Sequence, residues 1–247
     1  MTASLTMAGR SIRLSRRNLD LVIMAIMLPV LMMALFVYVF GGAIGHVESY
    51  VDYVVPGILV LCTGYGASST SMAVADDMKK GVIDRFRSMP VSSFAVLTGH
   101  VTASVARNAV ATSAVVLVAL LMGFRPSVSI VSWVLALGLL LLYVLALSWL
   151  AAGFGVIART VESASLLGFF MLFIPYLSSA FVPVDTMPAV LRVVSEHQPI
   201  TPVIETVRAL LTGQPATSGW LALAWSGGLL VAAFGWATWL FSRINRR

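Results

Sequence analysis

The sequence predicts an all-α polytopic membrane protein with six transmembrane helices. Hydrophobic residues make up 59% of its 247 residues, only 11% are charged, and the mean hydropathy is +0.96. A soluble domain carries about 25% charged residues, so the composition excludes that class. Six apolar runs are each long enough to cross about 30 Å of hydrocarbon as a helix. The expected spans cover residues 21–40, 54–75, 93–123, 129–157, 163–183 and 218–241.

Residues 1–20 precede the first span and are predicted to form an amphipathic helix that lies in the membrane interface. A helix over residues 3–20 separates an apolar stripe from a basic one. The stripes consist of Leu5, Ala8, Ile12 and Leu19 on one side and Arg10, Arg13 and Arg17 on the other. The alternative is a disordered basic tail that only sets topology. The apolar run that follows is too long for the core of a signal peptide, so we expect an uncleaved first span.

A charged segment between the second and third expected spans, residues 76–90, is predicted to form an amphipathic helix outside the hydrocarbon. It holds seven of the 26 charged residues in 15 positions. Met78, Val82, Phe86 and Met89 fall on one face of this helix, and the charged side chains fall opposite. Two interpretations are open. The helix either lies passively on the surface or transmits force from a soluble partner.

Residues 184–215, before the last span, interrupt the pattern of long apolar runs. Pro188, Pro199, Pro202 and Pro215 divide this segment into short stretches. Helices of about a dozen residues are too short to cross the hydrocarbon. The sequence therefore predicts interfacial or re-entrant helices here.

The distribution of basic residues predicts that both termini and the 76–90 segment are cytoplasmic. Six spans place the two termini on one side, and cytoplasmic segments carry an excess of Lys and Arg. Twelve basic residues lie on that side: Arg10, Arg13, Arg16, Arg17, Lys79, Lys80, Arg85, Arg87, Arg159, Arg243, Arg246 and Arg247. Only Arg125, Arg192 and Arg208 lie on the other. The same distribution accounts for the net charge of +6, so we expect a multi-pass protein of the cell membrane and no nucleic-acid partner.

No motif for catalysis or cofactor binding is present in the sequence. It lacks the G-x-x-x-x-G-K-[ST] loop that holds nucleotide phosphates, and it lacks G-x-S-x-G and H-E-x-x-H. His46, His100 and His197 lie far apart, and Cys62 is the single cysteine, which excludes an internal disulfide and a paired-cysteine metal site. We expect no catalytic residue, no cofactor and no metal on this chain.

A polar stripe in the third expected span is the candidate for a substrate pathway. Arg107 lies inside this span, and Ser104, Asn108 and Thr112 share its side of the helix. A charge at mid-membrane is costly, so a retained one is usually paired or functional. The stripe could line a pathway or pack against another helix, and Arg107 could alternatively extend toward the interface. Ser68 and Thr70 in the second span have the same two interpretations.

The source of energy separates the remaining hypotheses. An ion-coupled antiporter needs buried carboxylates, but the expected spans contain no Asp or Glu near their middles. This favours a bundle driven from outside by a soluble protein. A membrane scaffold that transports nothing is the third alternative.

Two stretches of the chain resemble those of type-2 ABC exporter permeases, and more narrowly the daunorubicin-resistance branch. The first runs from Asp77 to Ser92 and has an acidic residue, Lys-Lys-Gly, an amphipathic stretch and Pro-Val-Ser. The second combines Phe181–Pro188 with the run from His197 to Leu210, which includes His-Gln-Pro-Ile-Thr and Val-Arg-Ala-Leu. With the six-span layout, the resemblance covers nearly the whole chain.

The resemblance implies a fold, partners and site residues. Residues 1–20 would be an interface helix, 76–90 a coupling helix and 184–215 an extracellular re-entrant segment. Two permease copies would pair with two ATP-binding subunits, which would hold ATP and Mg²⁺. The permeases would export an amphiphilic drug or a lipid, whereas related permeases outside this branch move glycan chains. The implied coupling residues are Asp76, Asp77, Lys79, Lys80, Asp84, Arg85, Phe86, Arg87, Met89 and Pro90. Family permeases often have Glu where this chain has Asp76 and Asp77.

Overall fold

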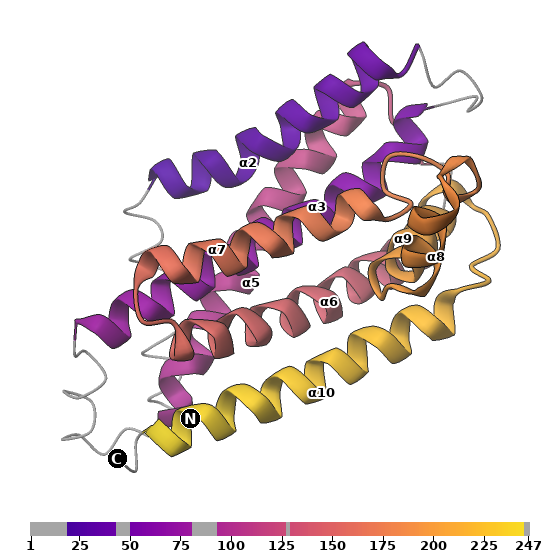
Figure 1. The fold of residues 1–247 in the computed structure, drawn as a ribbon. Helices are drawn as coiled ribbons and strands as arrows, with labels where there is room; N and C mark the ends of the chain where they lie inside the picture. The colour runs from indigo at the N-terminus through magenta and orange to yellow at the C-terminus, as the bar shows by residue number, and fades with distance from the viewer. Residues whose placement is uncertain (1–18, 43–49, 81–92, 127–128, 245–247) are drawn as a thin grey trace.

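The computed structural model describes residues 19–42, 50–80, 93–126 and 129–244. Its body consists of four helices that are long and apolar enough to cross a membrane. They are α3 (Tyr50–Lys79), α5 (Ser93–Leu121), α6 (Ile130–Ile157) and α10 (Gly219–Ile244). In Figure 1 they run roughly along one direction with α2 and α7 beside them. The described part of the chain contains helices and turns but no strand, as expected for an all-α multi-pass membrane protein.

Two further apolar helices are shorter than these four. The helix α2 (Leu19–Ala34) continues into a π-helical stretch, η1 (Leu35–Phe40), and α7 (Val161–Phe173) continues into a 3₁₀ turn, η2 (Ile174–Leu177). The six-span count therefore remains a prediction. The interface helix expected for residues 1–20 lies outside the described residues, apart from its last two positions, which belong to α2.

The predicted extent of the fifth span was wrong at its C-terminal end. Instead of continuing to residue 183, the α-helix ends at Phe173. Pro175 follows, and proline has no backbone N–H to donate to the preceding turn of an α-helix. The chain tightens into η2, and the Ser178 hydroxyl donates to the Pro175 carbonyl. Residues 178–181 then form a buried non-helical loop.

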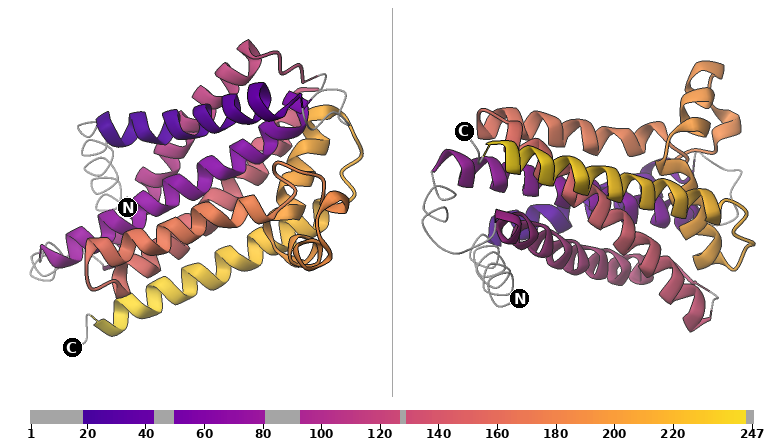
Figure 2. Two further views of the ribbon diagram at one scale, coloured as in Figure 1. Left: turned by 45° about the horizontal axis from the view of Figure 1, so that its top comes forward. Right: turned by 90° about the horizontal axis from the view of Figure 1, so that it is seen from below.

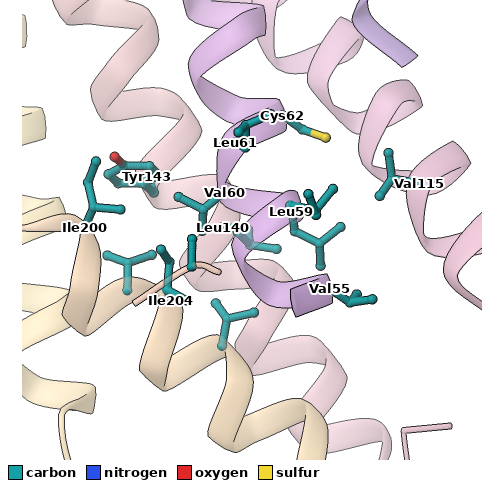
Figure 3. Close-up of a cluster of buried hydrophobic side chains, with 14 of the residues drawn as sticks. Val55, Leu59, Val60, Leu61, Cys62, Val115, Leu140, Tyr143, Ile200 and Ile204 are labelled. Atoms are coloured by element: carbon teal, nitrogen blue, oxygen red, sulfur yellow. The ribbon is translucent and has the colours of Figure 1, made fainter. Parts of the chain in front are cut away.

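The helix α3 is the innermost of the long helices. In its most apolar stretch of 18 residues, 72% is buried inside the protein, compared with 22–39% in the same kind of stretch of the other three long helices. Figure 3 shows Leu59 and Cys62 of α3 between Val115 of α5 on one side and Ile200 of α9 on the other. Because lipid is as apolar as these side chains, helix association in a membrane depends on close packing rather than on the exclusion of water.

Short helices are gathered at one end of the bundle. These are η3 (Val184–Thr186), α8 (Ala189–His197) and α9 (Ile200–Thr212), and Figures 1 and 2 place α8 and α9 at the end opposite the C-terminus. Prolines precede α8 and α9. Gly213 follows the last residue of α9, and its φ of 75° is the left-handed conformation common at helix C-termini. We call this the α8–α9 end, and the opposite end, where α3 finishes, the charged end.

Candidate functional site

The charged end begins inside α3 rather than after it. The helix continues beyond the expected span end at residue 75 to Lys79, so Asp76, Asp77 and Lys79 form its last turn. The Lys80 ammonium donates to the Asp76 carboxylate over 2.6 Å, one helical turn back. This bond raises the pKa of Lys80. The other predicted coupling residues lie outside the described residues: Asp84, Arg85, Phe86, Arg87, Met89 and Pro90.

A side-chain bond at the charged end joins α3 to α5. His100 Nε2 lies 3.1 Å from Asp77 Oδ2, and their side chains are only 12% and 16% exposed. Both groups are therefore largely removed from solvent, and an unpaired carboxylate would be costly there. The pair lies close to the described helix ends at Lys79 and Ser93.

The predicted polar stripe of α5 packs mainly against neighbouring helices. Ser104 is fully buried, and its hydroxyl lies 3.4 Å from the Gly66 carbonyl of α3 and accepts from Ser148 of α6 at 2.8 Å. Asn108 is 2% exposed and donates to the Ser104 carbonyl at 3.0 Å. These contacts join three helices and match the packing interpretation of the stripe.

Arg107 reaches across to α3. Its guanidinium donates to the Thr70 hydroxyl at 3.0 Å, and Thr70 in turn donates to the Gly66 carbonyl at 3.1 Å. Hydrogen bonding of this kind offsets part of the cost of a charge within a membrane span. The contact gives Arg107 an interhelical partner, which is one of the roles that the sequence left open.

Thr112 lies apart from this network. It lines a cleft of about 280 Å³ between α5 and α6. Asn108 is the one member of the polar network that also lines this cleft. The oxygen of its side-chain amide has no hydrogen-bond partner in the described protein. The cleft walls are otherwise largely apolar: Val105, Ala109, Ser113, Leu137, Leu140, Leu141 and Val144. The four stripe residues are thus divided between helix packing and this cleft, and the structure assigns none of them a substrate.

A second polar cluster lies at the α8–α9 end, around Arg208 of α9. The Arg208 guanidinium donates to the Tyr53 carbonyl of α3 at 3.0 Å and to the Ser179 carbonyl at 2.6 Å, and it lies 3.8 Å from the centre of the Tyr53 ring. The Tyr53 and Tyr50 hydroxyls donate to the carbonyls of Ser179 and Phe181. One cation thus joins α9, α3 and the buried loop after η2.

An open cavity of about 370 Å³ adjoins this cluster. Its charged and polar lining includes Asp185, Arg192, Glu196, Glu205 and Ser218. Burial raises the pKa of Glu205, although the nearby Arg208 charge and a hydrogen bond from Ser218 act in the opposite direction. In the described residues no group of His, Cys, Asp and Glu side chains is arranged to hold a metal ion.

Comparison with known families identifies the kind of protein to which this arrangement belongs. The model of the ABC-2 type transporter family matches residues 2–212, which is most of the chain. The chain belongs to the ABC-2 type transporter family. The match contains both the charged end and the Arg208 cluster, and it stops before α10.

Named relatives of this ABC-2 protein are permeases. It is 29% identical over 224 residues to the daunorubicin resistance ABC transporter permease protein DrrB1 of Streptomyces coeruleorubidus, covering 90% of this chain and 77% of the relative. It is 27% identical over 190 residues to the inner membrane transport permease YadH of Escherichia coli K12, covering 73% and 72%. These matches identify the chain as a multi-pass transport permease and bear out the resemblance of its motifs.

Sequence reasoning did not identify the two residues that make the interhelical contacts at the ends of this permease. His100 was set aside because no other histidine is near it, and its partner Asp77 is 23 residues away. Arg208 was noted only for its position in the Val-Arg-Ala-Leu run and in the count of basic residues. Its partner Tyr53 is 155 residues away, and no local pattern predicts contacts at such separations.

Proposed function

We propose that the chain is the membrane-spanning permease subunit of an ATP-driven ABC exporter. Membership of the ABC-2 family and the permease relatives support this proposal. The cargo would be an amphiphilic drug or a lipid-like molecule, moved out of the cytoplasm or the inner leaflet. The daunorubicin resistance named for one relative favours a drug-like amphiphile.

The observation that carries the proposal is the continuity of α3 with the charged end. Asp76, Asp77 and Lys79 are the last turn of the innermost long helix. A soluble protein bound to these charges would therefore act directly on the helix around which the bundle packs. Residues 76–90 would form the coupling helix seated on an ATP-binding subunit.

The proposal includes an assembly and an orientation. Two copies of the chain would pair as a homodimer with two ATP-binding subunits, and ATP and Mg²⁺ would bind to those subunits. The permease itself would not be an enzyme. It would cross the cell membrane six times with both termini in the cytoplasm, so that the α8–α9 end would face outward as the re-entrant segment.

An ion-coupled antiporter is the alternative that we do not favour. Such a protein moves protons or cations through carboxylates inside the membrane. No Asp or Glu is among the fully buried side chains of the described residues. Energy supplied by a separate ATPase agrees better with this composition.

Crosslinking from the charged end tests the proposed function. Lys80 is exposed, and Lys80→Cys in a Cys62→Ala background provides a single reactive thiol. With a short thiol-to-amine crosslinker in native membranes, we expect a product that contains an ATP-binding protein. The matched control is Gln214→Cys at the α8–α9 end, which is also exposed and should give no such product. Transport by the purified chain alone, driven by a proton gradient, would refute the proposal.

A further inference from the structure

The bond between His100 and Asp77 is placed where it can set the geometry of the charged end. Asp77 lies in the last turn of α3, and His100 lies in the second turn of α5. These two helices lead directly into and out of residues 81–92. The 3.1 Å separation therefore joins the two described helix ends that flank that segment.

Other polar side-chain contacts between α3 and α5 in the described residues lie deeper in the bundle. Along α5, His100, Ser104 and Arg107 follow one another at helical spacing of four and three residues, which places them on one face. Ser104 and Arg107 contact Gly66 and Thr70 of α3. His100 is the member of this row closest to the charged end, so its loss would remove the polar contact there while the deeper ones and the apolar packing of Leu97 near Val74 remain.

The chemistry of the pair makes it a directional contact. A carboxylate accepts strong hydrogen bonds, and with only 16% of its side chain exposed Asp77 retains little access to water. The histidine side chain has a rigid ring and only two rotatable bonds, so a bond from Nε2 restricts the separation of the two helices at this level. An apolar side chain at this position could pack there but could not donate a hydrogen bond to the carboxylate.

We propose that His100 is a positioning residue for coupling: by holding Asp77 it fixes the relative placement of the ends of α3 and α5, and with them the charges presented to the ATP-binding subunit. This role rests on the proposed function. His100 itself need not touch the partner. Its effect on transport is exerted through the position of Asp77 and of the last turn of α3.

A distance measurement on the permease alone tests the structural half of the proposal. Lys79 and Thr102 are exposed, and spin labels at cysteines in these positions, in the Cys62→Ala background, report the separation of the last turn of α3 from the third turn of α5, next to His100, in lipid nanodiscs. We expect His100→Leu to broaden the distance distribution, because the apolar side chain cannot hold the carboxylate. His100→Asn, which is polar but shorter, should do the same. His100→Gln keeps a donor at comparable reach and should retain the narrow distribution.

A coupling measurement on the complex tests the functional half. The permease without labels is reconstituted with its ATP-binding subunit in proteoliposomes containing daunorubicin, and ATP hydrolysis is compared with that of the ATP-binding subunit alone. Loss of a hydrogen bond to a mostly buried charge shifts an equilibrium by about tenfold. We therefore expect the His100→Leu permease to stimulate ATP hydrolysis about tenfold less than the wild-type permease does. His100→Gln should keep at least half of the stimulation. The matched control is Thr102→Val, an exposed α5 residue whose hydroxyl donates within its own helix to Thr98, and it should behave as wild type.

The two measurements separate the outcomes. Unchanged distances in both His100→Leu and His100→Asn would overturn the proposal, as would normal stimulation in a variant whose distances have broadened. Equal loss in His100→Gln and His100→Leu would also count against it, because rescue by the conservative variant is required. If the wild-type permease never stimulates the ATPase, the proposed function fails instead, and the distances still decide whether His100 joins the two helices.

Discussion

Gly66 allows α5 to approach α3 closely enough for its polar side chains to bond. A Cβ atom built at Gly66 would lie 2.2 Å from Asn108 Nδ2 and 2.4 Å from its Oδ1. That amide is held in turn by its bond to the Ser104 carbonyl. Small residues at helix interfaces have this role in lipid, where close contact replaces the exclusion of water as the source of stability.

We expect Gly66→Ala to destabilise the permease by about 1–3 kcal/mol, the range for overpacking in a filled interior. Gly138→Ala is the matched control, because a Cβ atom at Gly138 meets nothing within 4 Å. Asn108→Ala combined with Gly66→Ala should recover most of the loss, since it removes the clashing amide. Thermal unfolding in nanodiscs measures all three variants. A similar unfolding midpoint for the two glycine variants would contradict the packing account of Gly66.

At the scale of elements, Arg208 connects segments that are otherwise far apart in sequence. Its fork of donors reaches two carbonyls at once, that of Tyr53 in α3 and that of Ser179 in the loop after η2. A guanidinium can do this because its donors are fixed in one plane, whereas an ammonium acts as a single point. Arg208 thus adds a polar attachment of α9 to the innermost helix, beside the bonds from the Tyr50 and Tyr53 hydroxyls and the apolar packing of α9 on α3.

Arg208→Lys should loosen the α8–α9 end even though it keeps the charge. We expect amide hydrogen exchange of residues 178–182 to accelerate, by a factor that corresponds to about 1.5–3 kcal/mol for the loss of a hydrogen bond from a charged group, while the Ser179 carbonyl keeps its bond from the Tyr53 hydroxyl. Exchange in α10 should not change. Arg125→Lys, at an exposed position, serves as the matched control. Protection of the loop equal to that of wild type would show that Arg208 does not hold it.

At the scale of the whole molecule, the sequence predicts orientation through the distribution of its basic residues, and accessibility can test it. In the Cys62→Ala background, cysteine at exposed Gln214 should react with a membrane-impermeant maleimide in intact cells. Cysteine at exposed Arg159 should react only after the membrane is opened, because twelve of the basic residues are predicted to lie on that side. The reverse result would invert the proposed topology.

Composition and periodicity were sufficient to predict the long helices, because an apolar run long enough to cross the hydrocarbon can be recognised from its own residues without knowledge of its neighbours. Positions of α3, α5, α6 and α10 agree with the expected spans to within a few residues at most ends. The end of α7 was missed because Pro175 was read as part of a span, although a proline there ends the α-helix. For α3 the charged residues were assigned to a separate segment, although Asp76 and Asp77 lie within the same helix.

The site was less predictable than the helices. The sequence placed Ser104, Arg107, Asn108 and Thr112 on one side of their helix, but the neighbours that each one meets depend on how α3 and α6 pack, and Thr112 lies apart from the others. The pairing of His100 with Asp77 likewise depends on tertiary placement, because the two residues belong to different helices. Periodicity predicts which side chains share a face, but it does not predict which neighbouring helix that face contacts.

One consequence follows from the unbroken length of α3. With 30 residues and a rise of about 1.5 Å per residue, this helix measures about 45 Å, which exceeds the thickness of the hydrocarbon layer. It holds the Arg208 attachment through Tyr53 near its first turn and the His100 partner in its last. If an ATP-binding subunit binds the charged end as proposed, a tilt of α3 imposed there would also move the α8–α9 end, because both attachments belong to the same helix.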